Sequence, residues 1–451
     1  MTHSQEQTIP PVGAPGPTAD EANHPGMKRV ATASFIGTVI EFYDFGIYGT
    51  AAALVFPHVF FPALGEAAGT VASFATYGVA FVARPFGSLL FGHFGDRLGR
   101  KKSLIATMLL MGLATILVGC MPTANQIGMA APVLIVMLRV LQGLAAGGEF
   151  AGAVLFSSEH APKGKRGFWS MFPNFGGGGA ITLANLTFFL TTLFMSGDTF
   201  TSWGWRIPFL ASFLLVIVGL WIRLRIDETP VFKNNAARSG TSRIPFLEAF
   251  KHQPLQIALA AGTVMVGFAL TYIGGTYLVS YGTAVLELPR TFVLAMAMVG
   301  GLTISAGVVL GAALSDRIGR RWVIVGAASV AVVWALALFP ILDQGSRTVF
   351  AIGVPVTMFI SGVATGPQGA FLSELFHTRY RYTAAGLSYS LAGMVGGAVP
   401  PLIAASVIDS FGSFAFGCIL AGFCLVSLIC VLVVGETRQL DLDRATAEAA
   451  A

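Results

Sequence analysis

Charged side chains are scarce in this sequence. Only 11% of its 451 residues are Asp, Glu, Lys or Arg, whereas a typical soluble domain carries about 25%. Hydrophobic residues make up 55%, which is too much apolar mass for a disordered chain, and the remaining charge is too sparse to cover a soluble surface. The composition therefore excludes both classes and predicts an all-α, polytopic membrane protein.

Cysteine and histidine are also scarce, and none lies where a metal or redox site would need it. The four cysteines lie in or beside apolar runs, without metal-site or disulfide-framework spacing. The seven histidines lie in the N-terminal tail, the loops or the ends of apolar runs. The sequence has no H-E-x-x-H motif and no phosphate-binding loop. We therefore expect no enzyme, cofactor, nucleic-acid partner or ATPase subunit, and we expect a monomer in the lipid bilayer.

Twelve apolar segments are at or near the roughly 20 residues that a helix needs to cross a bilayer. They occupy residues 30–56, 70–92, 102–121, 130–157, 167–195, 205–224, 256–282, 291–314, 321–340, 348–374, 383–407 and 413–434. Alternate connections between them hold 22 of the 27 basic residues, and the opposite connections hold three. Because basic loops stay on the cytoplasmic side, we expect both termini in the cytoplasm.

The chain repeats one plan twice. The loop at 96–101 (DRLGRK) recurs at 316–321 (DRIGRR), and a Ser-Glu pair followed by Arg closes both the fourth and the tenth segment. This repetition predicts a duplicated six-helix unit with a site between the two bundles, as in many secondary transporters. The predicted organisation is a disordered cytoplasmic tail at 1–27, a bundle at 28–224, a cytoplasmic linker at 225–255, a bundle at 256–437 and a cytoplasmic tail at 438–451.

The repeated loops have two interpretations. Each is either a short basic turn or a latch, meaning a contact between neighbouring segments that stabilises one conformational state. We favour the latch, because Gly permits tight turns and Asp and Arg can pair with charges or helix ends. The second copy departs from the first by having Ala312 in the place of Gly92. The predicted latch residues are Gly92, Asp96, Arg97, Gly99, Arg100, Asp316, Arg317, Gly319, Arg320, Glu159, Arg166, Glu374 and Arg381.

Five charged residues lie inside the apolar segments, where charge is costly and marks a functional site. They are Glu41, Asp44, Arg84, Arg139 and Glu149. One explanation is that these residues form structural ion pairs. Three acids and two bases would then leave one carboxylate without a basic partner inside the membrane. Because burial disfavours the charged form of a carboxyl group, the unpaired acid can bind and release a proton. We expect Asp44, Glu149 or Glu41 to carry this proton, and the sequence does not separate the first two.

The second half has no such charges. Tyr272 and Gln368 lie deep enough to line a cavity opposite the charged half, whereas Tyr281 is expected to anchor a helix end at the membrane surface. On the charged half, Arg139 and Gln142 share one helix face. The predicted solute-binding residues are Arg84, Arg139, Gln142, Asn174, Tyr272 and Gln368.

Several strings resemble the metabolite:proton symporter family of the major facilitator superfamily. They are GTVIEFYDF at 37–45, ARP at 83–85, FGHFGDR at 91–97, RVLQGLAAGGE at 139–149 and WGWRIPF at 203–209. The family includes carriers of shikimate, α-ketoglutarate, citrate, and proline or betaine. The resemblance implies two six-helix bundles and uptake of a small organic solute, driven by the proton gradient across a bacterial cell membrane.

The solute itself is left open by this resemblance. Two intramembrane arginines suit a carboxylate, which a guanidinium group can hold in a bidentate fork, so we favour an organic acid. A zwitterion such as proline or betaine is the alternative, and so is export by proton antiport. A membrane enzyme or sensor is disfavoured.

Overall fold

The computed structural model describes residues 25–98, 100–147, 154, 157–158, 161–162, 164–225, 251, 253–376 and 381–438, and every regular element in them is helical. The first half contains α1 (Pro25–Leu54), α2 (Phe56–Phe60), η2 (Pro62–Leu64), α3 (Gly65–Leu98), α4 (Arg100–Cys120), α5 (Ala124–Ile127), α6 (Ala130–Gly147), α8 (Arg166–Ser170), α9 (Phe172–Phe194), α10 (Gly197–Thr199), η3 (Phe200–Gly204) and α11 (Arg206–Arg225). The second half contains α14 (Pro254–Tyr272), η4 (Ile273–Tyr277), α15 (Leu278–Ser280), η5 (Tyr281–Val285), α16 (Arg290–Ile318), α17 (Arg320–Leu342), α18 (Arg347–Thr365), α19 (Gln368–Leu375), α20 (Arg381–Ala392), η6 (Gly393–Ala398), α21 (Val399–Phe411) and α22 (Ser413–Val433).

The helical membrane fold is confirmed. Each predicted apolar segment falls on these helices, the segment at 130–157 only as far as it is described. By length and composition, nine helices of the described residues can cross a membrane, and a tenth span forms if Gly197–Gly204 and Arg206–Trp221, bent by 48°, are one. Of the other two segments, α4 offers a shorter apolar stretch, Ile105–Cys120, and α1 carries two acids at its centre.

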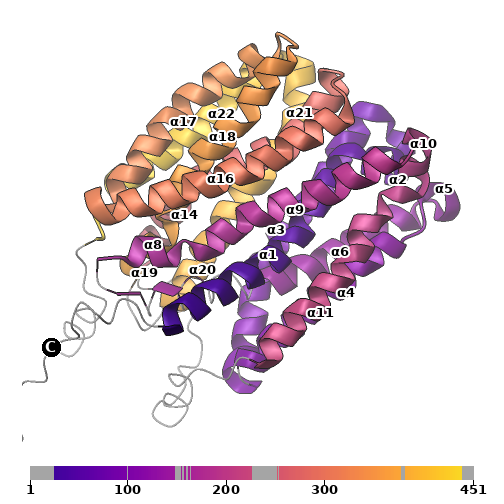
Figure 1. Ribbon diagram of the computed structural model, residues 1–451. Coiled ribbons are helices and arrows are strands. Elements are labelled where there is room, and N and C mark those ends of the chain that lie inside the picture. Colours follow the sequence, from indigo (N-terminus) through magenta and orange to yellow (C-terminus); the bar gives the residue numbers. More distant parts are fainter. Residues whose placement is uncertain are drawn as a thin grey trace, which may run out of the picture.

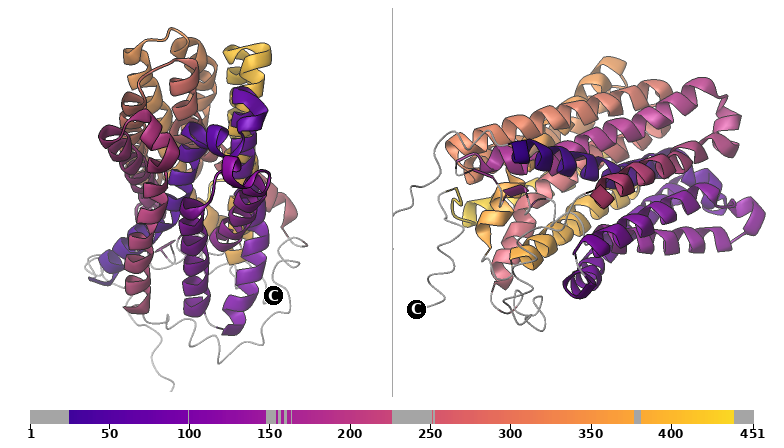
Figure 2. Two further views of the ribbon diagram at one scale, coloured as in Figure 1. Left: turned by 90° about the vertical axis from the view of Figure 1, so that its right-hand side faces the viewer. Right: turned by 60° about the horizontal axis from the view of Figure 1, so that its bottom comes forward.

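The long helices run side by side as two groups (Figures 1 and 2), and two seams join the groups. At one seam α9 packs against both α1 and α16; at the other, α3 packs against α20, η6 and α21. In Figure 1, α8 and α19 lie at one end of the bundle and α2, α5 and α10 at the other. The predicted 225–255 boundary between the halves falls largely outside the described residues and stays a prediction.

Glycines on α6 allow the close contact that places the charged residues. A Cβ atom at Gly143 would lie 2.3 Å from the Ala80 carbonyl oxygen, and one at Gly147 would lie 2.0 Å from the Arg84 carbonyl oxygen. Only glycine fits at these distances, so the small-residue spacing of the sequence brings the backbones of α3 and α6 into contact. This contact sets Arg84 on α3 beside the helix that carries Arg139.

Wider π-helical turns interrupt two spans of the second half, at η4, η5 and η6. Such turns often occur at functional sites. Tyr281, at the start of η5, is only 1% exposed, and its hydroxyl donates a hydrogen bond to Asp343 after α17. The expected surface anchor is therefore a buried side chain, because a neighbouring carboxylate supplies the acceptor that its phenol needs.

Candidate functional site

A cavity of about 70 Å³ lies between the two halves, where helices of both contribute to its wall. A water molecule needs roughly 10–15 Å³ in the same measure, so the cavity has room for several waters or part of a small solute. Its lining is largely aromatic and small, with a few amide and hydroxyl groups. Among the lining residues are Phe42, Phe45, Tyr77, Asn174, Asn185, Phe268, Thr271, Tyr272, Thr276, Thr365, Gln368 and Tyr389.

Three of the six predicted solute-binding residues line this cavity: Asn174, Tyr272 and Gln368. The Asn174 amide on α9 donates to the Thr365 carbonyl oxygen of α18 at 2.9 Å, a bond that joins the two halves at the cavity wall. The Gln368 amide donates to the carbonyl oxygen of Val264 at 3.2 Å. The other three, Arg84, Arg139 and Gln142, lie behind the wall, inside the first half.

Arg84 is buried next to the cavity without a full set of hydrogen-bond partners. Its side chain is 3% exposed, and neither Nε nor Nη2 has a partner among the described residues. The guanidinium carbon instead lies 4.1 Å from the centre of the Phe45 ring and 4.6 Å from that of Phe81. Phe45 lines the cavity, and the Arg84 side chain also interacts with the hydroxyl group of Tyr272, a cavity-lining residue of the second half.

Arg139 is completely buried and better partnered. Its Nη1 donates to Gln142 Oε1 at 2.9 Å and its Nη2 to the Tyr77 carbonyl oxygen at 3.2 Å, while Nε has no partner in the described part. The guanidinium carbon lies 3.8 Å from the centre of the Tyr48 ring. The predicted pairing of Arg139 and Gln142 on one helix face is therefore present. Its partners are neutral groups, so the guanidinium charge is balanced here by rings and dipoles.

Of the predicted acids, Asp44 lies near Arg139. Glu41 and Asp44 are 6% and 5% exposed, and the Asp44 carboxyl group interacts with the Thr115 hydroxyl and, over a longer distance, with Arg139. Within the described ranges, Asp44 forms no ion pair with Arg84 or Arg139 at 4.0 Å or less. A structural ion pair therefore does not explain Asp44. Glu149 lies outside the described residues.

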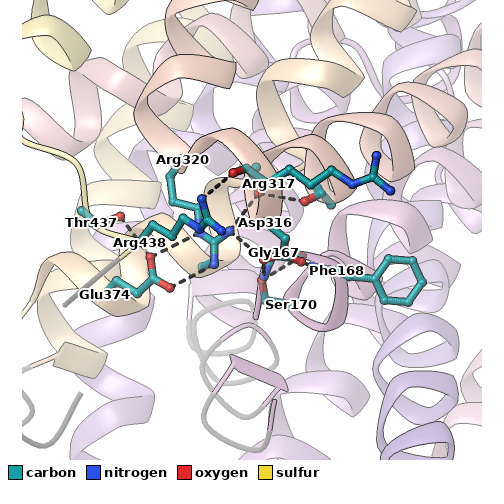
Figure 3. A network of polar contacts seen from close by, with 12 residues as sticks. Gly167, Phe168, Ser170, Asp316, Arg317, Arg320, Glu374, Thr437 and Arg438 are labelled. Atoms are coloured by element: carbon teal, nitrogen blue, oxygen red, sulfur yellow. Dashed lines mark hydrogen bonds and ion pairs between the residues drawn. The ribbon is translucent and has the colours of Figure 1, made fainter. Parts of the chain in front are cut away.

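The second predicted latch forms a polar network at the end of the bundle that carries α8 and α19 (Figure 3). The Asp316 carboxylate on α16 accepts hydrogen bonds from the backbone N–H groups of Gly167 and Phe168, both at 2.9 Å. These groups belong to the first turn of α8, where free N–H groups favour a negative charge. A residue of the second half therefore caps a helix of the first half.

Arg320 continues this network within the second half. Its guanidinium group bonds Asp316 at 2.7 Å and holds Glu374 through two bonds of 3.2 and 3.3 Å. The Thr437 hydroxyl donates to Glu374 at 3.0 Å, and Glu436 accepts from the backbone N–H of Arg320 at 2.9 Å. The side chains are almost fully buried, so the contacts are shielded from water.

The structure describes some of the other predicted latch residues but not all of them. Gly319 has φ +106°, which only glycine adopts readily, and a Cβ atom there would lie 2.3 Å from the Glu436 carboxylate. Arg381 Nε donates to the Phe376 carbonyl oxygen at 3.2 Å, and Arg166 begins α8. The Arg317 side chain points away from the network (Figure 3). Gly99, Glu159 and the side chains of Asp96, Arg97 and Arg100 lie outside the described part of the chain, and Gly92 lies on α3.

A further contact between the halves, at the other end of α16, was not anticipated from the sequence. The Arg290 guanidinium carbon, at the start of α16, lies 4.7 Å from the centre of the Phe200 ring in η3. Arg290 and Asp316 are about 39 Å apart along α16 at 1.5 Å per residue. One helix therefore contacts the first half at both of its ends. The only available signal was that Arg290 is one of three basic residues on the side where basic residues are rare.

Asp316→Asn is expected to weaken the contact at the α8 end and to shift the protein toward the state that is open there. Asn keeps one acceptor oxygen but loses the charge that pairs with Arg320 and caps α8. The loss amounts to about 1–2 kcal/mol, or roughly a 5- to 30-fold change in population. Single cysteines introduced at the two ends of the bundle should react faster at the α8 end and more slowly at the Arg290 end.

Arg317→Gln is the matched control for this prediction, because it removes a neighbouring charge that points away from the network. It should leave both reactivities unchanged. Equal reactivity of wild type and Asp316→Asn at both ends would contradict the latch.

Comparison with known proteins identifies the family. A model described as Major Facilitator Superfamily matches residues 34–401. The inner membrane metabolite transport protein YhjE of Escherichia coli is 40% identical over 420 residues, covering 92% of this chain and 96% of that protein. The shikimate transporter of the same organism is 37% identical and covers 91% and 95%; its proline/betaine transporter is 30% identical and covers 93% and 86%.

The fold agrees with this assignment. A crystal structure of a D-xylose-proton symporter superposes with a TM-score of 0.72 at 15% identity, covering 91% of this chain and 98% of that one. The transporter names of the relatives confirm the resemblance to the metabolite:proton symporter family. This chain therefore belongs to the major facilitator superfamily and is a multi-pass membrane transporter, not an enzyme.

Proposed function

We propose that this transporter takes up a small organic acid together with protons by alternating access, as a monomer without a cofactor or ATPase subunit. The proposal is supported chiefly by two buried arginines beside the cavity, neither of which forms an ion pair with Asp44. In this proposal the end with α8 and α19 faces the cytoplasm, as the basic loops predict.

An anionic solute follows from the hydrogen bonds that Arg84 lacks. A buried cation is costly unless an anion pairs with it, and Nε and Nη2 of Arg84, which have no hydrogen-bond partner among the described residues, form the fork that holds a carboxylate. A solute carboxylate that displaces the Phe45 ring would meet this fork. Among the relatives, a shikimate transporter favours such a solute.

Proton coupling follows from the burial of Asp44. A carboxyl group that is 5% exposed and forms no ion pair with a described residue can be held neutral by its surroundings and charged after a small rearrangement. The nearby Arg139 offers that rearrangement, because it can turn toward the carboxylate once the proton leaves. Proton release would then change how Arg139 contacts Tyr77, a residue of the cavity wall.

A zwitterion is the second candidate, since aromatic rings from both halves line the cavity and can hold an ammonium group. A proline/betaine transporter among the relatives supports it. The purified protein should be tested for thermal stabilisation by shikimate, citrate, α-ketoglutarate, proline and betaine. We expect only acids to raise the melting temperature, by mass action. Stabilisation by betaine or proline alone would replace the organic acid by a zwitterion.

Transport direction is tested with the solute that this panel selects. In right-side-out vesicles, an acidic exterior should drive accumulation, and a collapsed gradient should reduce the inside-to-outside ratio to one. With one proton per solute, one pH unit supports about tenfold accumulation. Accumulation only with an alkaline exterior would instead indicate antiport.

A further inference from the structure

The Arg139 guanidinium group is held in place by neutral acceptors on two helices. Gln142 Oε1 accepts a hydrogen bond from Nη1 at 2.9 Å, and the Tyr77 carbonyl oxygen accepts one from Nη2 at 3.2 Å. Its Nε has no partner among the described residues. An arginine with a spare donor near a carboxyl group would pair with it if nothing restrained it. The other contacts of Arg139 must therefore keep it from pairing with the Asp44 carboxyl group.

Gln142 supplies this restraint through both ends of its amide. Its oxygen accepts from Arg139, and its Nε2 donates to Thr115 Oγ1 on α4 at 2.8 Å. The side chain is fully buried, so no water replaces either bond if the amide turns. Thr115 thus fixes the amide, and the amide fixes the guanidinium group.

The Thr115 hydroxyl also contacts the Asp44 carboxyl group, and its single hydrogen makes the contact sensitive to protonation. In the structure this hydrogen is donated to the Met111 carbonyl oxygen at 3.0 Å. When Asp44 is protonated, Thr115 Oγ1 can accept from Asp44 and Gln142 while it donates to Met111. When Asp44 is ionised, the carboxylate needs a donor, and the Thr115 hydrogen must leave Met111 to supply it.

The charged and titratable groups that face Asp44 are few. In the described ranges they are Arg139 on α6, and Glu41 and Tyr43 on α1 itself; α4 contributes the neutral Thr115. Arg139 is the one cation among them. Only a movement of Arg139 can therefore bring positive charge to the ionised carboxylate from this set.

We propose that Gln142 and Thr115 are positioning residues for proton coupling: they hold Arg139 away from Asp44, so that an ionised Asp44 must compete with Gln142 for the guanidinium group. This inference rests on the proposed proton coupling at Asp44. It gives Gln142, which lies away from the cavity, a role in the proton step in place of the solute contact that the sequence suggested.

The test follows the infrared absorption of protonated carboxyl groups in the reconstituted protein, titrated with pH in the absence of solute. Asp44→Asn should remove one titrating band and so identify Asp44. Gln142→Leu frees Arg139 to pair with the carboxylate, so the midpoint of that band should fall by about one pH unit. In an Arg139→Leu background, the same substitution should cause no shift, because Gln142 acts through Arg139.

Two variants of Thr115 give a second measurement. Thr115→Val releases the Gln142 amide but also removes a hydroxyl donor to the ionised carboxylate, so its direct effect must be separated from the effect of Arg139. The lowering of the midpoint that Arg139 causes, measured as the difference from the Arg139→Leu background, should be larger in Thr115→Val than in wild type, whereas Thr115→Ser keeps the hydroxyl and should leave that difference unchanged. Thr263→Val is the matched control, because Thr263 is buried and its hydroxyl has no partner among the described residues. It should leave the midpoint unchanged.

The outcomes separate this inference from the proposed function. If Asp44→Asn removes no titrating band, proton coupling at Asp44 is wrong, and the inference fails with it. If the band is present but Gln142→Leu leaves its midpoint unchanged, and Thr115→Val leaves the effect of Arg139 on the midpoint unchanged, only the inference is overturned. A shift of equal size without Arg139 overturns it as well.

Discussion

Asp44→Asn is expected to abolish accumulation of the solute against its gradient while solute exchange across the membrane continues. Asn has nearly the same shape as the protonated carboxyl group but cannot release a proton, so it locks the neutral state. At one pH unit of gradient, the accumulation ratio should fall from about ten to one. The measurement compares acid-driven uptake with counterflow in proteoliposomes that contain the purified variant.

Two further acids serve as comparisons. Glu41→Gln changes the neighbouring carboxyl group on α1, three residues earlier, and Glu149→Gln changes the third intramembrane acid of the sequence. We expect both to keep more of the proton-driven accumulation than Asp44→Asn. Full coupling in Asp44→Asn, with uncoupled exchange in one of the other two, would move the proton site to that residue.

The fold could be predicted from the sequence because a bilayer permits few solutions. Every backbone polar group in the hydrocarbon must be bonded internally, so a long apolar segment becomes a helix. The packing of α3 on α6 has a similarly local cause, since Gly143 and Gly147 allow α3 to approach closely. Helical periodicity also placed Arg139 beside Gln142, because residues three apart share a face.

The partners of the site residues could not be predicted in the same way. Thr115 contacts Asp44 and Gln142 only because α1, α4 and α6 meet, and a threonine in an apolar run gives no sign of this. The repeated loop drew attention to Asp316, but the backbone N–H groups of α8 that donate to it lie about 150 residues earlier in the chain. Such contacts depend on how distant helices pack, and local sequence patterns carry no information about that packing.

The sequence also could not show which of the two arginines lies closer to the solute cavity. Sequence alone placed Arg84 and Arg139 inside apolar segments and offered both as ligands for a carboxylate. The structure distinguishes them, because two nitrogens of Arg139 are bonded, whereas Nε and Nη2 of Arg84 are not. The two arginines therefore have different surroundings within the first half. Arg139 lies near Asp44, whereas Arg84 interacts with Phe45 and Tyr272 in the cavity wall.

Arg84→Met is therefore expected to weaken binding of an organic acid more than any change at Arg139 that leaves the fold intact. Methionine fills similar space on the Phe45 and Phe81 rings but cannot bond a carboxylate. Hydrogen bonds to a charged group are worth about 1.5–3 kcal/mol, which corresponds to a roughly 10- to 150-fold loss of affinity. Calorimetric titration of the purified protein with the acid selected by the stabilisation panel measures this loss.

Arg84→Lys tests whether the fork or the charge matters. Lysine keeps the charge but offers a single ammonium group in place of the planar pair of donors, so affinity should lie between wild type and Arg84→Met. The Asn174→Ala variant provides the comparison at the cavity wall, since it removes a bond between the halves and leaves the cation. If Arg84→Met binds the acid as tightly as wild type, the solute carboxylate is held elsewhere. The missing hydrogen bonds of Arg84 would then have to be filled by the protein itself in another conformational state.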